Sequence, residues 1–259
     1  MVIDTAASTL FCLQKPLEEA VPDLLAAGTK CIEIVDDGPH ALTRSRVEKL
    51  RELQSSHDLK YSLHAPFVDV NIAATDASLR QATLRRLRDS VSWASTLRAE
   101  ALVLHPGSKS VMEQFTPGAA WRTNIEPLRS ILNFAQDLGV PTMIENLPEP
   151  YPFLMKSVED FERFYAESGL DVRMVLDVAH ASLRGETLAF IGRLGERIGH
   201  IHVSDNGGGM DEHLKLGEGS IDWVEAVEAI KSISFSGWVV VESFKGIQES
   251  LALLQRILN

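Results

Sequence analysis

The chain has 259 residues, of which 45% are hydrophobic and 24% charged, and this composition excludes a disordered or fibrous protein. The 25 basic and 36 acidic residues give a net charge of −11, which argues against a protein whose main task is binding nucleic acid. The length suits one α/β barrel, for which about 250 residues is usual, so we expect a single domain over residues 1–259.

The N-terminal segment has no basic stretch followed by an apolar run, so we expect no signal peptide. No run approaches the roughly 18 apolar residues of a membrane span. The two cysteines offer no disulfide framework, which is typical of a reducing compartment. These features predict a soluble, cytoplasmic protein without a membrane partner.

Short apolar runs alternate with longer periodic segments along the chain. Some runs are continuously apolar, as in Trp238–Val241, and such runs are typical of strands buried on both faces of a parallel sheet. The predicted strands are Val2–Asp4, Cys31–Val35, Tyr61–His64, Ala101–His105, Thr142–Glu145, Arg173–Asp177, Ile198–Val203 and Gly237–Glu242.

Helical periodicity fills the intervals between these runs. Apolar residues recur at spacings of three and four around Leu17–Leu24, Trp223–Ile230 and Ile247–Leu258. Two helix starts carry a capping-box pattern, namely Ser157 with Asp160 and Asp222 with Glu225. The segment Ala77–Leu97 has one apolar face, and its arginines predict a solvated face rather than a binding patch; they are Arg80, Arg85, Arg86 and Arg88.

Eight predicted strands alternating with about eight helices indicate a parallel β/α repeat without a linker. A single (β/α)₈ TIM barrel accounts for this pattern best. A doubly wound open sheet is the alternative.

Six consecutive predicted strands end in, or close to, a histidine or a carboxylate. These residues are His64, His105, Glu145, Asp177, His202 and Glu242. In a barrel the C-terminal ends of the strands converge on one pocket, which is where barrel enzymes keep their active sites. All six residues are metal-ligand types.

Three further candidate ligands follow in the loops, namely His180, Asp211 and His213. Nine nitrogen and oxygen ligands exceed the needs of one ion, so they imply two or three. Any single residue of this kind could be a hydrogen-bonded structural residue, but a whole ring would repel itself without a cation. His200, two residues before His202, is expected in the barrel core with a hydrogen-bond partner, and His40 and His57 at the surface.

Four cations follow predicted strand ends and could hold a substrate phosphate or carboxylate, although a solvated surface charge is the expectation for each. They are Lys109, Arg184, Lys215 and Lys245.

Several of these motifs together resemble the xylose-isomerase-like TIM-barrel superfamily. The motifs are Leu63-His-Ala-Pro66, His105-Pro-Gly107, Glu145-Asn146, Asp177-Val-Ala-His180, His202-Val-Ser-Asp205, Asp211-Glu-His213 and Leu216-Gly-Glu-Gly219. This superfamily contains sugar isomerases and epimerases and also endonuclease IV, an abasic-site DNA repair enzyme. The resemblance covers nearly the whole chain and does not single out one activity.

Resemblance to endonuclease IV implies three zinc ions. The first would be bound by His64, His105 and Glu145, the second by Glu145, Asp177, His202 and Glu242, and the third by His180, Asp211 and His213. Resemblance to the epimerases implies one metal on the second set, with Glu145 and Glu242 exchanging protons with the sugar and His180 contacting it. The resemblance thus implies zinc or manganese, with one to three ions.

The loops depart from the endonuclease pattern. The segment Asp36–Leu42 is acidic and small where endonuclease IV carries basic and aromatic residues, and Phe67 and Val68 offer no tyrosine wedge. We therefore expect a divalent-metal-dependent isomerase or epimerase of a small sugar or sugar phosphate, in which the metal chelates two substrate oxygens and stabilises an enediolate. The alternative is an endonuclease-IV-like phosphodiesterase acting on abasic-site DNA or a small phosphoester. A non-catalytic, metal-dependent ligand-binding barrel is a third alternative, and other metal-assisted lyases or hydrolases are a fourth.

Overall fold

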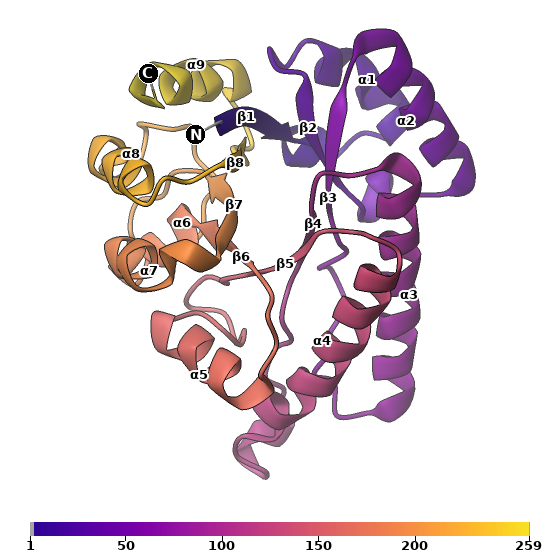
Figure 1. Cartoon of the computed structure of the whole chain (residues 1–259), viewed down its shortest axis with the longest axis vertical. Coiled ribbons are helices and arrows are strands. Elements are labelled where there is room, and N and C mark those ends of the chain that lie inside the picture. The colour runs from indigo at the N-terminus through magenta and orange to yellow at the C-terminus, as the bar shows by residue number, and fades with distance from the viewer. Residues whose placement is uncertain (1–2, 259) are drawn as a thin grey trace.

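A closed barrel of eight parallel strands in chain order forms the centre of the computed structural model, which describes residues 3–258 (Figure 1). The strands are β1 (Ile3–Ser8), β2 (Cys31–Val35), β3 (Lys60–His64), β4 (Leu102–Leu104), β5 (Thr142–Glu145), β6 (Met174–Asp177), β7 (Ile198–Val203) and β8 (Gly237–Val241). Pairing of β1 with β8 closes the sheet, which confirms the (β/α)₈ barrel and excludes the open doubly wound sheet.

The strand bounds agree with the apolar runs to within a few residues, and three strands match their predictions completely. The first strand differs most. Val2 lies outside the described residues, and β1 continues to Ser8 because Ala6–Ser8 pair with β2. Strands β4 and β8 end one residue earlier than predicted, so His105 and Glu242 lie just beyond their strands.

Helices surround the barrel (Figure 1). They are α1 (Leu17–Leu25), α2 (Arg44–His57), α3 (Ala77–Leu97), α4 (Ala119–Asp137), α5 (Val158–Ser168), α6 (Val178–Ser182), α7 (Thr187–Leu194), α8 (Trp223–Ser232) and α9 (Ile247–Leu258). The Ser157–Asp160 capping box is present at α5, and Asp222 caps α8 by accepting from two backbone N–H groups. No helix within residues 3–258 is long and apolar enough to cross a membrane.

Alternate residues of each strand enter the barrel, because successive side chains in a strand point to opposite faces. On β2, Cys31 joins a small apolar cluster inside the barrel, and Val35, four residues later, lines the cavity at its C-terminal end. Ile32 and Ile34, which alternate with the inward-facing residues, pack in the large core under the helices. This period of two is what places all the strand-end ligands on the inner face.

Two expectations for surface residues are wrong. His40 is fully buried, because the 3₁₀ turn η2 (Gly38–His40) folds its ring into the interior, where burial lowers its pKa. Arg86 leaves the solvated face of α3 and reaches the fully buried carboxylate of Asp36. His57, by contrast, is exposed as predicted.

Candidate metal centre

A compact group of four buried residues occupies the C-terminal end of the barrel. It consists of Glu145, Asp177, His202 and Glu242, whose candidate ligand atoms all lie within 4.8 Å of one another. The Nδ1 atom of His202 lies 3.0 Å from Glu145 Oε1 and 3.3 Å from Glu242 Oε2. Three carboxylates and one imidazole nitrogen thus face a common point, which we call the inner group.

Glu145 also belongs to a second compact group with His64 and His105. Its Oε2 atom lies 3.2 Å from His64 Nε2 and 2.8 Å from His105 Nε2. His64 Nδ1 lies 2.8 Å from the carbonyl oxygen of Ala65, which holds the ring with Nε2 toward the glutamate. Oε1 of Glu145 thus faces the inner group and its Oε2 faces the two histidines, so this residue belongs to both compact groups.

The three loop residues meet in a different arrangement. Asp211 Oδ2 lies 3.2 Å from His180 Nε2 and 3.0 Å from His213 Nε2, so one carboxylate oxygen joins both imidazoles. The second nitrogen of each ring faces a backbone oxygen, that of Asn146 for His180 and that of Glu242 for His213. Within residues 3–258 this outer trio is not among the compact groups of ligand atoms.

Crowded carboxylates partly neutralised by imidazoles set the electrostatics of this centre. Burial, together with the charges of nearby carboxylates, raises the pKa of Asp177 to about 7. Burial opposes ionisation of Glu145 too, but the charges of His202 and His105 hold its pKa well below the usual value. Burial would lower the pKa of His180, yet Asp177 and Asp211 raise it to about 10. Protonated imidazoles thus supply positive charge that the carboxylates require.

The donor set fits a divalent cation. Asp177 Oδ2 and Asp211 Oδ1 are buried and have no hydrogen-bond partner among residues 3–258, although burying an unpartnered carboxylate oxygen is costly. A cation in the inner group would satisfy Asp177 Oδ2 and offset the mutual repulsion of the carboxylates there, and a second one at the outer trio would satisfy Asp211 Oδ1. Mixed imidazole and carboxylate ligands suit zinc, and carboxylates also suit manganese.

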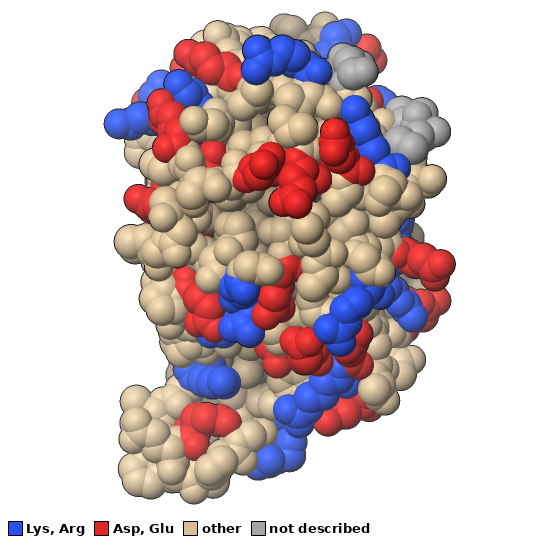
Figure 2. Space-filling view, turned by 90° about the vertical axis from the view of Figure 1, so that its left-hand side faces the viewer, with Lys and Arg blue, Asp and Glu red and all other residues tan. Residues whose placement is uncertain are grey.

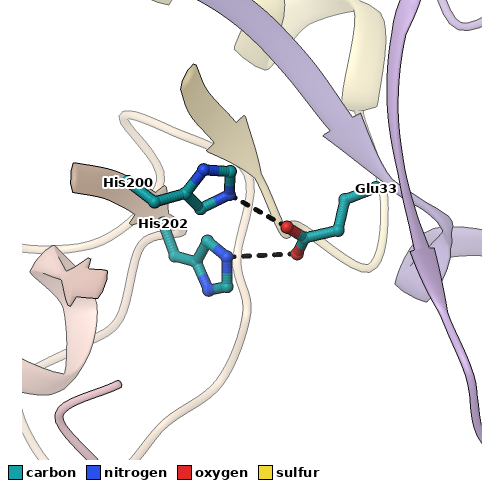
Figure 3. A group of neighbouring side chains, drawn as sticks. All are labelled: Glu33, His200 and His202. Carbon is teal, nitrogen blue, oxygen red and sulfur yellow. Dashed lines mark hydrogen bonds and ion pairs between the residues drawn. The ribbon is translucent and has the colours of Figure 1, made fainter. Parts of the chain in front are cut away.

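Sequence reasoning missed Glu33, which lies in the middle of β2 and is fully buried. Its carboxylate contacts His200 and His202 from across the barrel (Figure 3). His200 is therefore a core histidine with a hydrogen-bond partner, as predicted. The sequence did contain a signal for Glu33, because it is the one charged residue in the apolar run Cys31–Val35. It lies two residues from Cys31 and two from Val35, so all three side chains point into the barrel.

A cavity of about 320 Å³ opens above the metal centre. Its polar wall contains His64, His105, Glu145, His180, Asp211, His213 and Glu242. The opposite walls are apolar or aromatic, formed by Leu10, Val35, Phe67, Pro148, Tyr151, Phe153 and Phe244. Seven of the nine candidate ligands thus line one cavity, while Asp177 and His202 lie beneath it in the inner group.

The four cations considered for phosphate binding are absent from this lining within residues 3–258. Arg184 pairs with Glu149 and Glu186, and Lys215 pairs with Glu218. A larger hollow of about 570 Å³ lies elsewhere, between α4 and the loop before β6, and contains none of the nine candidate ligands.

Comparison with known sequences finds relatives in both branches of one family. A family model described as xylose isomerase-like TIM barrel matches residues 21–257. An uncharacterized protein of Methanocaldococcus jannaschii is 29% identical over 248 residues, covering 94% of this chain and 84% of that protein. Fructoselysine 3-epimerase of Shigella flexneri is 20% identical over 236 residues (88% and 85% covered). Probable endonuclease 4 of Mycobacterium ulcerans is 23% identical over 245 residues (90% and 93% covered).

Solved structures with the same barrel include a D-tagatose 3-epimerase-like protein, which is 28% identical with a TM-score of 0.91, covering 98% of this chain and 97% of that chain. A Thermus thermophilus protein soaked with zinc chloride is 25% identical with a TM-score of 0.73 (99% and 98% covered). The zinc-binding IolI protein is 20% identical with a TM-score of 0.79 (98% and 96% covered). Zinc therefore accompanies this fold in at least one solved structure.

Proposed function

Because the chain belongs to the xylose isomerase-like TIM barrel family, we propose that it is a divalent-metal-dependent epimerase or isomerase of a small sugar. The observation that carries the proposal is the pair of buried glutamates, Glu145 and Glu242, on either side of His202 Nδ1 at the floor of a small cavity. Two carboxylates facing one substrate position can remove a proton from a carbon atom and return one to it.

In this proposal the inner group holds the metal, which supplies positive charge beside the carbonyl and hydroxyl oxygens of the substrate. One of Glu145 and Glu242 removes the proton from the carbon next to the carbonyl, and the other delivers a proton to the opposite face. His180 and Asp211 line the same wall, so they contact the substrate hydroxyls. The apolar and aromatic walls would pack against the carbon skeleton of the sugar.

The cavity favours a neutral sugar over a sugar phosphate. Among the described residues no lysine or arginine lines it, and a phosphate group is normally bound by cations or backbone N–H groups. Tyr151 is the one hydrogen-bond donor among the side chains of the opposite walls within the described residues. We therefore propose a non-phosphorylated sugar, with its polar oxygens toward the metal centre.

Hydrogen exchange with solvent tests this proposal directly. The metal-loaded protein should incorporate deuterium from D₂O into a ketose at the carbon next to the carbonyl, read by proton NMR over a panel of ketohexoses and ketopentoses. Glu145→Gln and Glu242→Gln should abolish exchange, while Glu113→Gln, which alters a glutamate outside the cavity lining, should leave it unchanged. Exchange that persists at the wild-type rate in both cavity variants would refute the assigned roles.

A phosphodiesterase is the second candidate, favoured by the second compact group and the outer trio. Glu145 is shared between the two compact groups, as in sites that hold neighbouring ions, and paired ions clamp phosphoryl oxygens. Against it stands the loop after β2, which has no lysine or arginine in residues 36–42. On the flank of the barrel shown in Figure 2, lysine and arginine are interspersed with acidic residues and form no continuous basic surface. Cleavage of abasic-site duplex by the metal-loaded protein, lost in Asp211→Ala, would favour this candidate.

A further inference from the structure

Three side chains meet inside the barrel beneath the inner group (Figure 3). Glu33 of β2 extends across the barrel toward His200 and His202 of β7, and all three are at most 2% exposed. Glu33 Oε2 accepts from His200 Nε2 at 2.9 Å and from Ser62 Oγ at 2.9 Å. Glu33 Oε1 lies 3.1 Å from His202 Nε2.

Among the described residues, Glu33 Oε1 and His202 Nε2 each have one polar contact, which is the contact with the other. Both atoms are buried, and neither makes a hydrogen bond among the described residues, so the ion-pair contact of 3.1 Å between them carries the argument. The other oxygen of Glu33 already accepts from two donors, and the other nitrogen of His202 faces the inner group. A carboxylate oxygen can only accept, and both nitrogens of His202 face carboxylate oxygens, so each would carry a proton until a cation in the inner group replaces the one on Nδ1 and leaves the other on Nε2.

We propose that Glu33 is a positioning residue that fixes His202 with its proton on Nε2 and its Nδ1 lone pair directed at the inner group, where a metal would bind. A neutral imidazole has one donor and one acceptor nitrogen, so a proton held on Nε2 leaves Nδ1 free to coordinate. A carboxylate acceptor also makes the ligating nitrogen more basic. The role concerns ligand geometry, so it holds whichever reaction the centre performs.

The carboxylate form of Glu33 is required because two imidazoles depend on it. Each of its oxygens faces an Nε2 atom, one on His200 and one on His202. A glutamine at this position would keep the shape but present one oxygen and one NH₂ group, so one imidazole would face a donor. It would also remove the negative charge that favours the Nε2–H form of His202.

Glu33→Gln tests the proposal through metal affinity rather than activity. Competition with a chromogenic chelator should show zinc or manganese bound about 10- to 100-fold more weakly, the usual effect of losing an outer-shell carboxylate. The matched control is Ser62→Ala, which removes the neighbouring hydrogen bond to Oε2 and leaves Oε1 and His202 in contact. This control should bind metal within about threefold of wild type.

A second readout does not need the variant to fold. In the zinc-loaded wild-type protein, long-range ¹H–¹⁵N spectra should find His202 protonated on Nε2 and metal-bound through Nδ1. Metal on Nε2, or Glu33→Gln affinity within threefold of wild type, would overturn the proposal. Loss of a whole metal equivalent in Glu33→Gln, with His202 Nε2 unprotonated, would make these residues a metal site and also overturn it.

Discussion

Arg86 is expected to stabilise the barrel by neutralising a carboxylate that has no access to water. It reaches from α3 to Asp36, just after β2, with Nη2 2.6 Å from Oδ1 and Nη1 2.9 Å from Oδ2. Nη2 also donates to the Asp36 carbonyl oxygen at 2.7 Å. The Asp36 side chain is 0% exposed and that of Arg86 30% exposed. Arg86→Met would keep most of the side-chain volume and leave a buried, unpaired charge.

Removing one partner of a buried ion pair usually costs about 3–5 kcal/mol. The lower end applies here, because water can enter where Arg86 is partly exposed and the Leu42 N–H group still donates to Asp36 Oδ1. We expect Arg86→Met to lose about 3 kcal/mol of unfolding free energy. For a chain of this size that corresponds to a fall of about 6–12 °C in Tm.

Urea unfolding followed by circular dichroism measures this loss. Arg85→Met is the matched control, since Arg85 is the exposed neighbour on the same helix and should change stability by less than about 0.5 kcal/mol. The double variant Asp36→Asn, Arg86→Met removes the unpaired charge and should recover part of the loss. An Arg86→Met protein as stable as the Arg85→Met control would refute the argument that Asp36 needs a counter-charge.

Glu145→Gln should reduce the metal bound by both compact groups while the fold stays intact, because Glu145 belongs to both. Elemental analysis showing full metal content would contradict this shared position. The variant Asp211→Ala, His213→Ala should lose about one metal equivalent if the outer trio holds an ion, with the inner ions retained; unchanged content would leave these residues as substrate contacts or loop structure. In protein stripped of metal, the pKa is raised to about 7 for Asp177 and to about 10 for His180. The protonated forms of these two groups therefore stabilise the fold, and this contribution is lost as the pH rises through those values. The Tm of the stripped protein should therefore fall from about pH 6 to about pH 9, and added manganese should remove the fall; a Tm that rises over this range would contradict these pKa directions.

The barrel and the ring of candidate ligands follow from local sequence patterns. Continuous apolar runs identify buried parallel strands, and the regular alternation with amphipathic segments specifies the β/α repeat. Because all strands of such a barrel run the same way, residues at the C-terminal ends of different strands, such as Glu145 and Glu242, are brought to one end of the barrel. No contact between distant residues is needed for that inference.

The tertiary structure decided how those residues are partnered. Asp36 and Arg86 are 50 residues apart, and Glu33 and His200 are 167 apart, so neither pairing leaves a local pattern. The register of β2 against its neighbours turns Glu33 inward, and closure of the barrel places it opposite β7. The same closure directs the two oxygens of Glu145 to different groups. Sequence spacing fixes which end of a strand a side chain occupies, but only packing around the closed barrel fixes which atom it faces.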